Sequence, residues 1–115
     1  MSYEVEFYET ESGRCPTDEF LNTLKPKPLA KVHAYLELLE ERGPNLTRPF
    51  ADGLRDKIRE LRPDFAHEAI RLLYFFFGKT IVVTHGFRKK TERTPPVEIE
   101  RAIRYMRDSI GRRPQ

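Results

Sequence analysis

Residues 69–87, AIRLLYFFFGKTIVVTHGF, contain the pattern from which the fold of this chain is predicted. Two runs of β-branched and aromatic residues, Ala69 to Phe77 and Lys79 to Phe87, meet at Gly78, which is typical of two strands joined by a tight turn. Leu72 to Phe77 is apolar at every position, so both faces of that strand must be covered. The stretch therefore predicts a hairpin that contains a central strand of the sheet.

Two further strands are predicted on the N-terminal side of this hairpin. Tyr3 to Tyr8 alternates apolar and acidic residues, as a half-buried strand requires. Lys57 to Arg62 is ambiguous, because its apolar residues have the spacing of a helix while the following Pro63 and Asp64 suit a strand that ends in a turn. We predict a strand at this position.

Three segments have the apolar spacing of helices. The first begins at Pro16 or Thr17 and ends before Pro26, and the second is the amphipathic stretch Leu29 to Glu41. The third has Thr94 as its expected N-cap and ends at Gly111. Residues 45–53, which include Pro49 and Gly53, are predicted to form a loop.

The order of these elements is strand, helix, helix, strand, strand, strand, helix, which favours the α+β class. We expect a small antiparallel sheet with two N-terminal helices and one C-terminal helix packed mainly on one face. A length of 115 residues fits one domain, residues 1–115.

Composition excludes several classes of protein. The chain is 38% hydrophobic and 34% charged, and it has neither a signal-peptide pattern nor an apolar run long enough to span a bilayer, so we expect a cytoplasmic protein that does not contact membranes. The lone Cys15 cannot form an intramolecular disulfide, and the three histidines have no metal-ligand spacing. We therefore expect no metal and no other cofactor.

Charge is distributed unevenly along the chain. Residues 1–52 hold six Lys and Arg against ten Asp and Glu, a balance of −4, whereas residues 53–115 hold fifteen against eight, a balance of +7. Such an asymmetry either marks a surface that binds a polyanion, of which nucleic acid is the common case, or consists of ordinary solvated side chains.

Catalytic motifs of the familiar kinds are absent from the sequence, which contains no GxSxG, Walker loop, GxGxxG, HExxH or CxxC. What remains is a group of cations on and after the predicted strands, with Glu60 and His85 among them: Arg59, Arg62, Arg71, Arg88, Lys89, Lys90 and Arg93. Arginine suits phosphate binding through its planar fork, and lysine acts as a point charge.

Arg71 and His85 each allow two interpretations. Because Arg71 lies within an apolar run, it either pairs with Glu60 or Glu68 in a structural salt bridge or points at a bound phosphate. His85 either takes part in proton transfer or makes a hydrogen bond with the backbone. Arg88, Lys89 and Lys90 are consecutive, so on a strand they cannot all point the same way.

A set of short motifs in the second half of the chain resembles the phage-derived, HigB-like branch of the RelE toxin superfamily. In chain order the motifs are Glu60-Leu61-Arg62, Arg71-Leu72-Leu73-Tyr74, His85-Gly86-Phe87-Arg88-Lys89-Lys90-Thr91, Thr94-Pro95 and Glu98-Ile99-Glu100-Arg101-Ala102. Each motif is weak alone, but their combination in this order is specific. The predicted order of elements in the first half agrees with the two N-terminal helices of that family.

The resemblance implies a ribosome-dependent mRNA interferase, an endoribonuclease toxin that uses the 2′-hydroxyl of the RNA as its nucleophile. Its partners would be a cognate antitoxin, often a helix-turn-helix protein in the HigA style and able to form a hetero-oligomer with it, together with the ribosome and mRNA.

The resemblance also implies roles for individual residues. Arg71 would be the main phosphate clamp with Arg62 and Lys89 as supports, and Lys90 or His85 would be the proton donor. Glu60 would be the base or an orienting group. Further RNA contacts would come from Arg59, Arg88 and Arg93.

Two other classes of function remain open. The same basic sheet could serve a non-catalytic module that binds RNA or a protein. Alternatively, the apolar strand Leu72 to Phe77 and the acidic first half could serve only to dock another chain. The clustering of cations around Arg71 and Arg88 to Lys90 favours the toxin.

Overall fold

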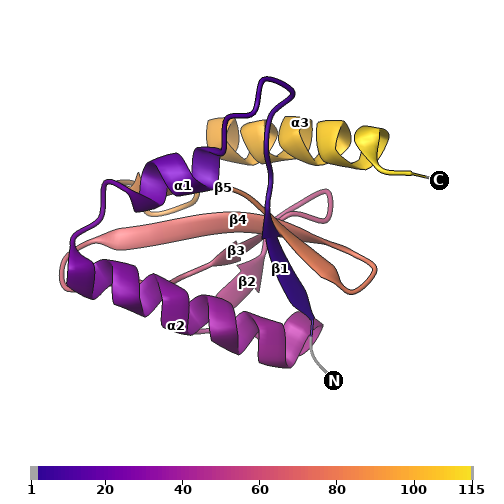
Figure 1. The fold of residues 1–115 in the computed structure, drawn as a ribbon. Coiled ribbons are helices and arrows are strands. Elements are labelled where there is room, and N and C mark those ends of the chain that lie inside the picture. Colours follow the sequence, from indigo (N-terminus) through magenta and orange to yellow (C-terminus); the bar gives the residue numbers. More distant parts are fainter. Residues whose placement is uncertain (1–2, 115) are drawn as a thin grey trace.

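The computed structural model describes residues 3–114 and contains one mixed sheet and three α-helices (Figure 1). The ends of the predicted domain, Met1, Ser2 and Gln115, lie outside the described residues. The elements in chain order are β1 (Glu4–Phe7), α1 (Pro16–Leu21), α2 (Pro26–Arg42), a short 3-10 helix (Gly43–Asn45), β2 (Ala51–Gly53), β3 (Arg59–Leu61), β4 (Ala69–Phe77), β5 (Thr80–Lys89) and α3 (Pro96–Arg112). The predicted α+β class is confirmed.

The sheet has the strand order β1-β5-β4-β3-β2, so β4 is its central strand as predicted. Its neighbouring pairs β2/β3, β3/β4 and β4/β5 are antiparallel, whereas β1 pairs with β5 in parallel. The prediction of a purely antiparallel sheet was therefore wrong at one edge. Alternation of apolar residues shows which side chains share a face, but it does not show the direction of the neighbouring strand.

Strand β2 was missed, because Ala51–Gly53 lies in the segment predicted to be a loop. It pairs with β3 in the register Ala51 opposite Leu61 and Gly53 opposite Arg59. A strand of three residues is too short to show periodicity, and its glycine is a residue that strands usually disfavour. The predicted strand at Lys57 to Arg62 is confirmed, with the shorter bounds of β3.

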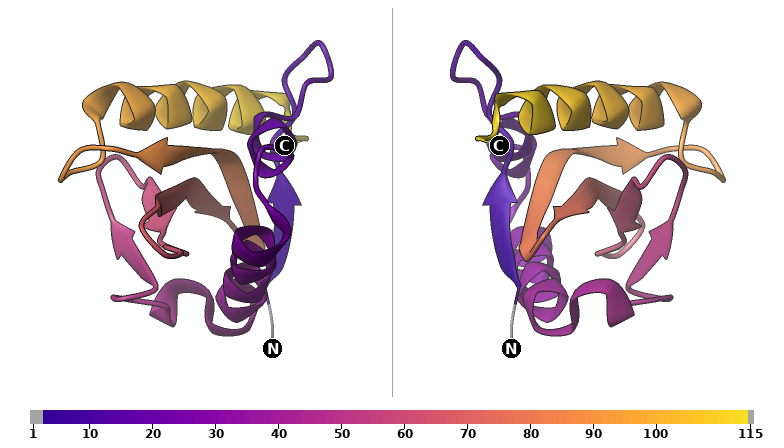
Figure 2. Two further views of the ribbon diagram at one scale, coloured as in Figure 1. Left: turned by 90° about the vertical axis from the view of Figure 1, so that its left-hand side faces the viewer. Right: turned by 90° about the vertical axis from the view of Figure 1, so that its right-hand side faces the viewer.

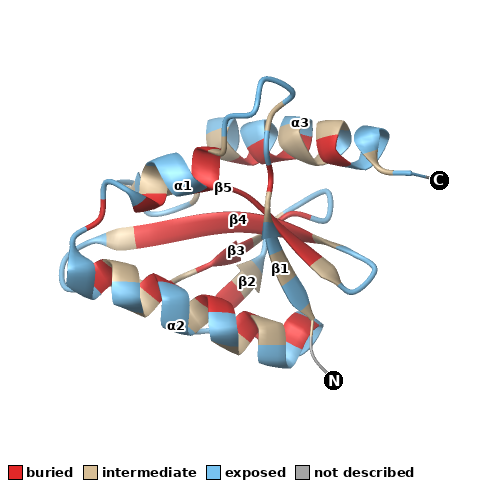
Figure 3. Cartoon of the chain, in the orientation of Figure 1, coloured by how far each residue is buried: buried red, intermediate tan, exposed pale blue. Residues whose placement is uncertain are grey.

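Helices cover both faces of the sheet, and the prediction that they pack mainly on one face was wrong (Figure 2). On the side called here the α2 face, α1 and α2 pack on the sheet, and the core includes Val32 of α2 with Leu61 and Tyr74 of the sheet. On the opposite side, the α3 face, the core includes Phe75 and Ile99. Figure 3 shows the buried residues concentrated in β4, β5 and the helix sides that contact them. Helices must pack on both faces of the sheet because the central strand β4 carries apolar residues on each face.

Helix α1 approaches the sheet closely at Gly86 of β5. A Cβ atom at this position would lie 2.5 Å from Cδ2 of Phe20, a distance that side chains do not tolerate. The glycine therefore allows the aromatic ring of α1 to rest directly on the strand backbone.

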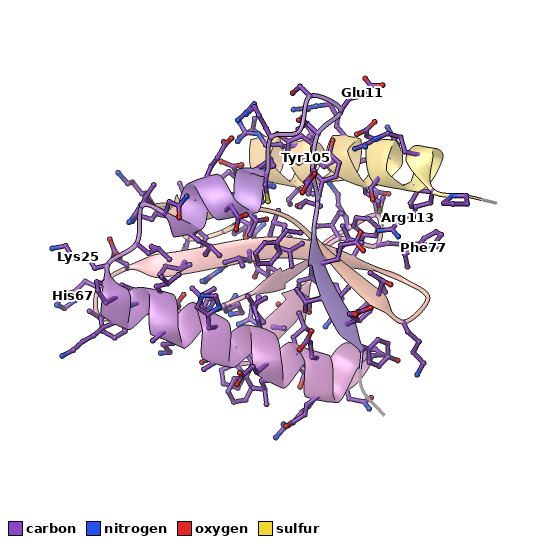
Figure 4. All side chains as sticks on the ribbon, in the orientation of Figure 1. Glu11, Lys25, His67, Phe77, Tyr105 and Arg113 are labelled. Atoms are coloured by element: carbon purple, nitrogen blue, oxygen red, sulfur yellow. The ribbon has the colours of Figure 1, made fainter. Side chains whose placement is uncertain are left out.

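The C-terminal end of α3 is held at the edge of the sheet that lies far from β2. The Arg113 guanidinium pairs with Glu6 at 2.6 Å and lies over the Phe77 ring, 4.8 Å from its centroid (Figure 4). Tyr8 donates a hydrogen bond to Asp108 at 2.6 Å. None of the helices within residues 3–114 has the length and apolar character needed to cross a membrane.

Candidate functional site

A cavity of about 390 Å³ opens beside the N-terminal end of α3, where it meets β2, β3 and the end of β5. Its polar lining consists of Arg48, Asp52, Glu60, Arg62, Lys89, Glu92, Arg93 and Thr94. Four of the residues predicted to form the site, Glu60, Arg62, Lys89 and Arg93, therefore meet in one place.

Glu60 is the most deeply buried charged residue of this cavity, with 3% of its surface exposed. It lies opposite Leu73 in β4, so its side chain is on the α3 face. Arg62 Nη1 donates a hydrogen bond to one carboxylate oxygen at 2.8 Å, and Thr94 Oγ1 donates to the other. Arg71 Nε lies 3.6 Å from Oε1. Such partners offset the free-energy cost of burying a carboxylate.

Arg71 does not line the cavity, because it lies beneath Glu60 with only 2% of its surface exposed. Its Nη1 donates to the Asp64 carboxylate and, at 2.8 Å, to the carbonyl of Ile70. Of the two interpretations of Arg71, the structural salt bridge is the one that these contacts describe. The partners are Glu60 and Asp64, whereas Glu68 pairs with Arg88 at 3.1 Å.

The segment that follows β5 brings further cations to the cavity. Lys89 Nζ donates to the carbonyl oxygens of Thr91 at 3.0 Å and Glu92 at 2.7 Å, which fixes the ammonium group at the rim. Arg93 is exposed and has no ion pair within residues 3–114. Lys90 is exposed next to Lys89 but does not line the cavity.

His85 lies on the same face but is closed off from the cavity. Its Nε2 is 3.0 Å from a carboxylate oxygen of Glu98, and its Nδ1 is 3.1 Å from the hydroxyl of Thr84. Burial lowers the pKa of His85, and the Glu98 carboxylate opposes part of this shift. Tyr105 packs edge-on against the imidazole and stacks on Tyr8, so its ring is part of the packing on this face. His85 is 2% exposed and does not line the cavity.

Arg59 and Arg88 do not belong to this site, because both side chains are on the α2 face. Arg59 lies opposite Tyr74 and donates to its hydroxyl at 3.4 Å and to the carbonyl of Leu46 at 3.3 Å. Arg88 bonds with Thr23 and Glu68. The strand pleat separates each of these arginines from its neighbour in the sequence, since alternate residues point to opposite faces.

Sequence reasoning missed several residues of the site. Thr94 was taken for the N-cap of α3, but the helix begins at Pro96 after Pro95, so the threonine hydroxyl is available to Glu60 instead. Arg48 pairs with Asp52 at 2.9 Å, and its hydrogen bond lowers the pKa of that carboxyl. Asp64 had no distinguishing sequence feature beyond its place in the turn after β3.

A row of exposed arginines on α3 was also missed, although its spacing of three residues is visible in the sequence. It consists of Arg101, Arg104 and Arg107. Arg101 is 3.6 Å from Glu98, whereas the other two have no ion pair within the described residues. This row extends the positive charge from the cavity along the outer side of the helix.

The fold is that of a small α+β protein, and its cavity is lined by four cationic and three acidic side chains. The sequence profile of the family described as "Phage derived protein Gp49-like (DUF891)" matches residues 19–107, and the chain belongs to this family. It is a type II toxin family related to the RelE- and HigB-like toxins, and a toxin of this type implies a cognate antitoxin.

No curated protein matches the chain. Within residues 3–114, no group of three or more His, Cys, Asp or Glu side chains is arranged to hold a metal ion.

Proposed function

We propose that this protein is the endoribonuclease of a type II toxin–antitoxin pair and cleaves mRNA on the ribosome. The observation that supports this most directly is the cavity that Arg62, Lys89 and Arg93 line together with Glu60, whose buried carboxylate pairs with Arg62. Cations near a carboxylate are what RNA cleavage by 2′-hydroxyl attack requires, because negative charge develops on the phosphate while a proton must leave the nucleophile.

In the proposed reaction, the 2′-oxygen forms a bond to the adjacent phosphorus and the bond to the 5′-oxygen breaks. The products are a 2′,3′-cyclic phosphate and a 5′-hydroxyl. Arg62, Lys89 and Arg93 bind the phosphate oxygens and stabilise the added negative charge. Glu60 accepts the proton of the 2′-hydroxyl, and Lys90, on the exposed segment next to the cavity, donates one to the leaving oxygen.

Arg71 has a supporting role in this proposal. While Glu60 covers it, its guanidinium does not face the cavity, and its contacts hold Glu60 and Asp64 in place. The family resemblance implied Arg71 as the main phosphate clamp, but Arg62 lines the cavity and is therefore the first arginine that an entering phosphate meets.

The proposed partners are the ribosome with its mRNA and a cognate antitoxin of the helix-turn-helix kind that forms a hetero-oligomer with the toxin. The exposed arginines of α3 would contact the phosphate backbone of ribosomal RNA. An interaction of this kind is electrostatic and weakens as salt rises.

The test is cleavage of mRNA by the purified protein in the presence and absence of ribosomes. We expect cleavage only with ribosomes, and a loss of about 100-fold or more in the rate for Arg62→Ala, the range seen when a charge-stabilising donor is removed. Arg88→Ala is the matched control, because it removes an arginine from the opposite face. Wild-type protein that leaves mRNA intact on ribosomes, or Arg62→Ala protein that cleaves at the wild-type rate, would refute the proposal.

A non-catalytic binding module is the second candidate, and the pairing of cations within the cavity favours it. Arg48 and Arg62 are each neutralised by a carboxylate, and Lys89 is held by backbone carbonyls. Such a module would bind ribosomes with ordinary affinity but would neither cleave mRNA nor arrest growth when expressed.

A further inference from the structure

The carboxylate of Glu60 lies where three donors from separate parts of the chain converge. Arg62 comes from the end of β3, Arg71 from β4, and Thr94 from the segment before α3. Residues 60 and 94 are 34 positions apart, so the arrangement depends on the tertiary fold. Two guanidinium groups and a hydroxyl form the kind of donor set that binds phosphate oxygens.

The carboxylate of Glu60 does not accept a hydrogen bond from every donor that surrounds it. Arg71 Nε is buried and has no hydrogen-bond partner within the described residues, and its distance of 3.6 Å from Glu60 makes it an ion-pair contact only. A planar carboxylate has two oxygens, whereas a phosphate can present three or more acceptors. The unpaired N–H therefore points to an anion larger than the one that occupies the position.

We infer that Glu60 fills a phosphate-binding position formed by Arg62, Arg71 and Thr94, and that a substrate phosphate must displace its carboxylate to bind there. This inference rests on the proposed function in taking the ligand to be a phosphodiester. It deepens that proposal, because displacement frees the carboxylate of Glu60 beside the bound phosphate, where it can accept the 2′-hydroxyl proton.

A phosphate can replace the Glu60 carboxylate because the position is reached from the cavity. The Arg62 side chain is 20% exposed and faces the cavity, whereas the side chain of Glu60 is 4% exposed. A phosphate can therefore reach Arg62 from the solvent side, and Glu60 can turn towards Lys89 and Arg93, which line the same space. In the free protein the carboxylate competes with the ligand for the same donors, so phosphate affinity is held down.

The experiment measures binding of inorganic phosphate by NMR, following the Nε–H signals of Arg62 and Arg71 in the full chain. We expect Glu60→Gln to bind phosphate at least tenfold more tightly than the wild type, because an uncharged amide no longer competes. Adding Arg62→Ala to that variant should abolish the gain. Glu100→Gln is the matched control, since it makes the same change in net charge on an exposed residue outside the cavity, and its affinity should change less than twofold.

A measurement on the wild type covers the case in which Glu60→Gln does not fold. Phosphate should shift the side-chain carboxyl carbon signal of Glu60 with the same midpoint as the Arg62 signal. The inference is overturned if folded Glu60→Gln gains no affinity, if Glu100→Gln gains as much, or if the Glu60 carboxyl signal stays still while Arg62 responds. Failure of the proposed function is seen separately, as absent mRNA cleavage by wild-type protein, because phosphate binding is measured without RNA.

Discussion

The two faces of the sheet use arginine in different ways. On the α2 face, Arg59 and Arg88 lie at the rim of an apolar core and bond mainly to hydroxyl and carbonyl groups. On the α3 face, Arg62 and Arg71 converge on a buried carboxylate beside an open cavity. Arg59 and Glu60 are adjacent in the sequence yet belong to different faces. Charge clustering along a strand therefore overstates the number of cations that one ligand can meet.

The difference arises from what covers each face. Helix α2 lies along the sheet and supplies buried residues such as Val32 and Leu39 over its length. Helix α3 begins only at Pro96, and its apolar stripe covers Phe75 and Val82, whereas a cavity with a largely polar lining lies beside Glu60 at the end of β3. Polar side chains occupy this place and must satisfy one another.

The largest expected effect is a loss of stability when the buried network on the α3 face is broken. Arg71→Ala should lower the free energy of unfolding by about 3 kcal/mol, because Glu60 and Asp64 lose a buried cation. Arg59→Ala on the α2 face should cost only about 1 kcal/mol, the value of ordinary hydrogen bonds. Urea unfolding of both variants measures the difference, and equal losses would show that the two faces do not differ in this respect.

The α2 face should be more sensitive to added volume. Gly86→Ala places a methyl group against the ring of Phe20 and should destabilise the protein by about 1–3 kcal/mol. Gly111→Ala is the control on α3, where a Cβ atom would meet nothing within 4 Å, so this variant should be as stable as the wild type or slightly more stable. Thermal unfolding of the pair tests the close approach of α1, and a harmless Gly86→Ala would disprove it.

The α3 face should also be the pH-sensitive one, because His85 is buried there. Its pKa is lowered from 6.5 by burial against the opposing effect of Glu98, so the unfolded chain takes up a proton at a higher pH than the folded chain. Stability should be complete above pH 6.5 and should fall as pH drops below it, by at most about 1.4 kcal/mol per pH unit.

His85→Gln should flatten this decline, whereas His33→Gln, an exposed position on α2, should leave it unchanged. Unfolding curves at pH 5 to 7.5 provide the measurement. A decline of the same slope in the His85→Gln variant would assign the pH dependence to other groups.

The smallest effect concerns the outer side of α3. Replacing Arg104 and Arg107 by Gln should weaken binding to a single-stranded RNA about fivefold and should reduce the slope of log affinity against log salt by roughly 0.7 for each RNA phosphate that is no longer neutralised. The matched change of Lys25 and Lys27 to Gln, at the start of α2, should alter neither quantity. A salt slope that responds equally to both pairs would mean that α3 is not a preferred RNA surface.

The β4–β5 hairpin, the amphipathic helices and the α+β class could be predicted from the sequence, because they depend on local periodicity and turn residues. The sequence also located the basic half of the chain and several residues of the cavity. Motif order predicted a toxin of the RelE and HigB type, and the family match at residues 19–107 supports a toxin family related to these proteins.

The direction of β1, the placement of α3 on the face opposite α2, and the position of Arg71 beneath Glu60 became visible only in the folded chain. The fold also directs the hydroxyl of Thr94 to a carboxylate 34 residues away. Periodicity shows which residues of one segment share a face, but it contains no information on which distant segment covers that face. The segment that covers a buried charged side chain supplies its partners. Which arginines are structural and which can bind a ligand therefore becomes clear only in the folded chain.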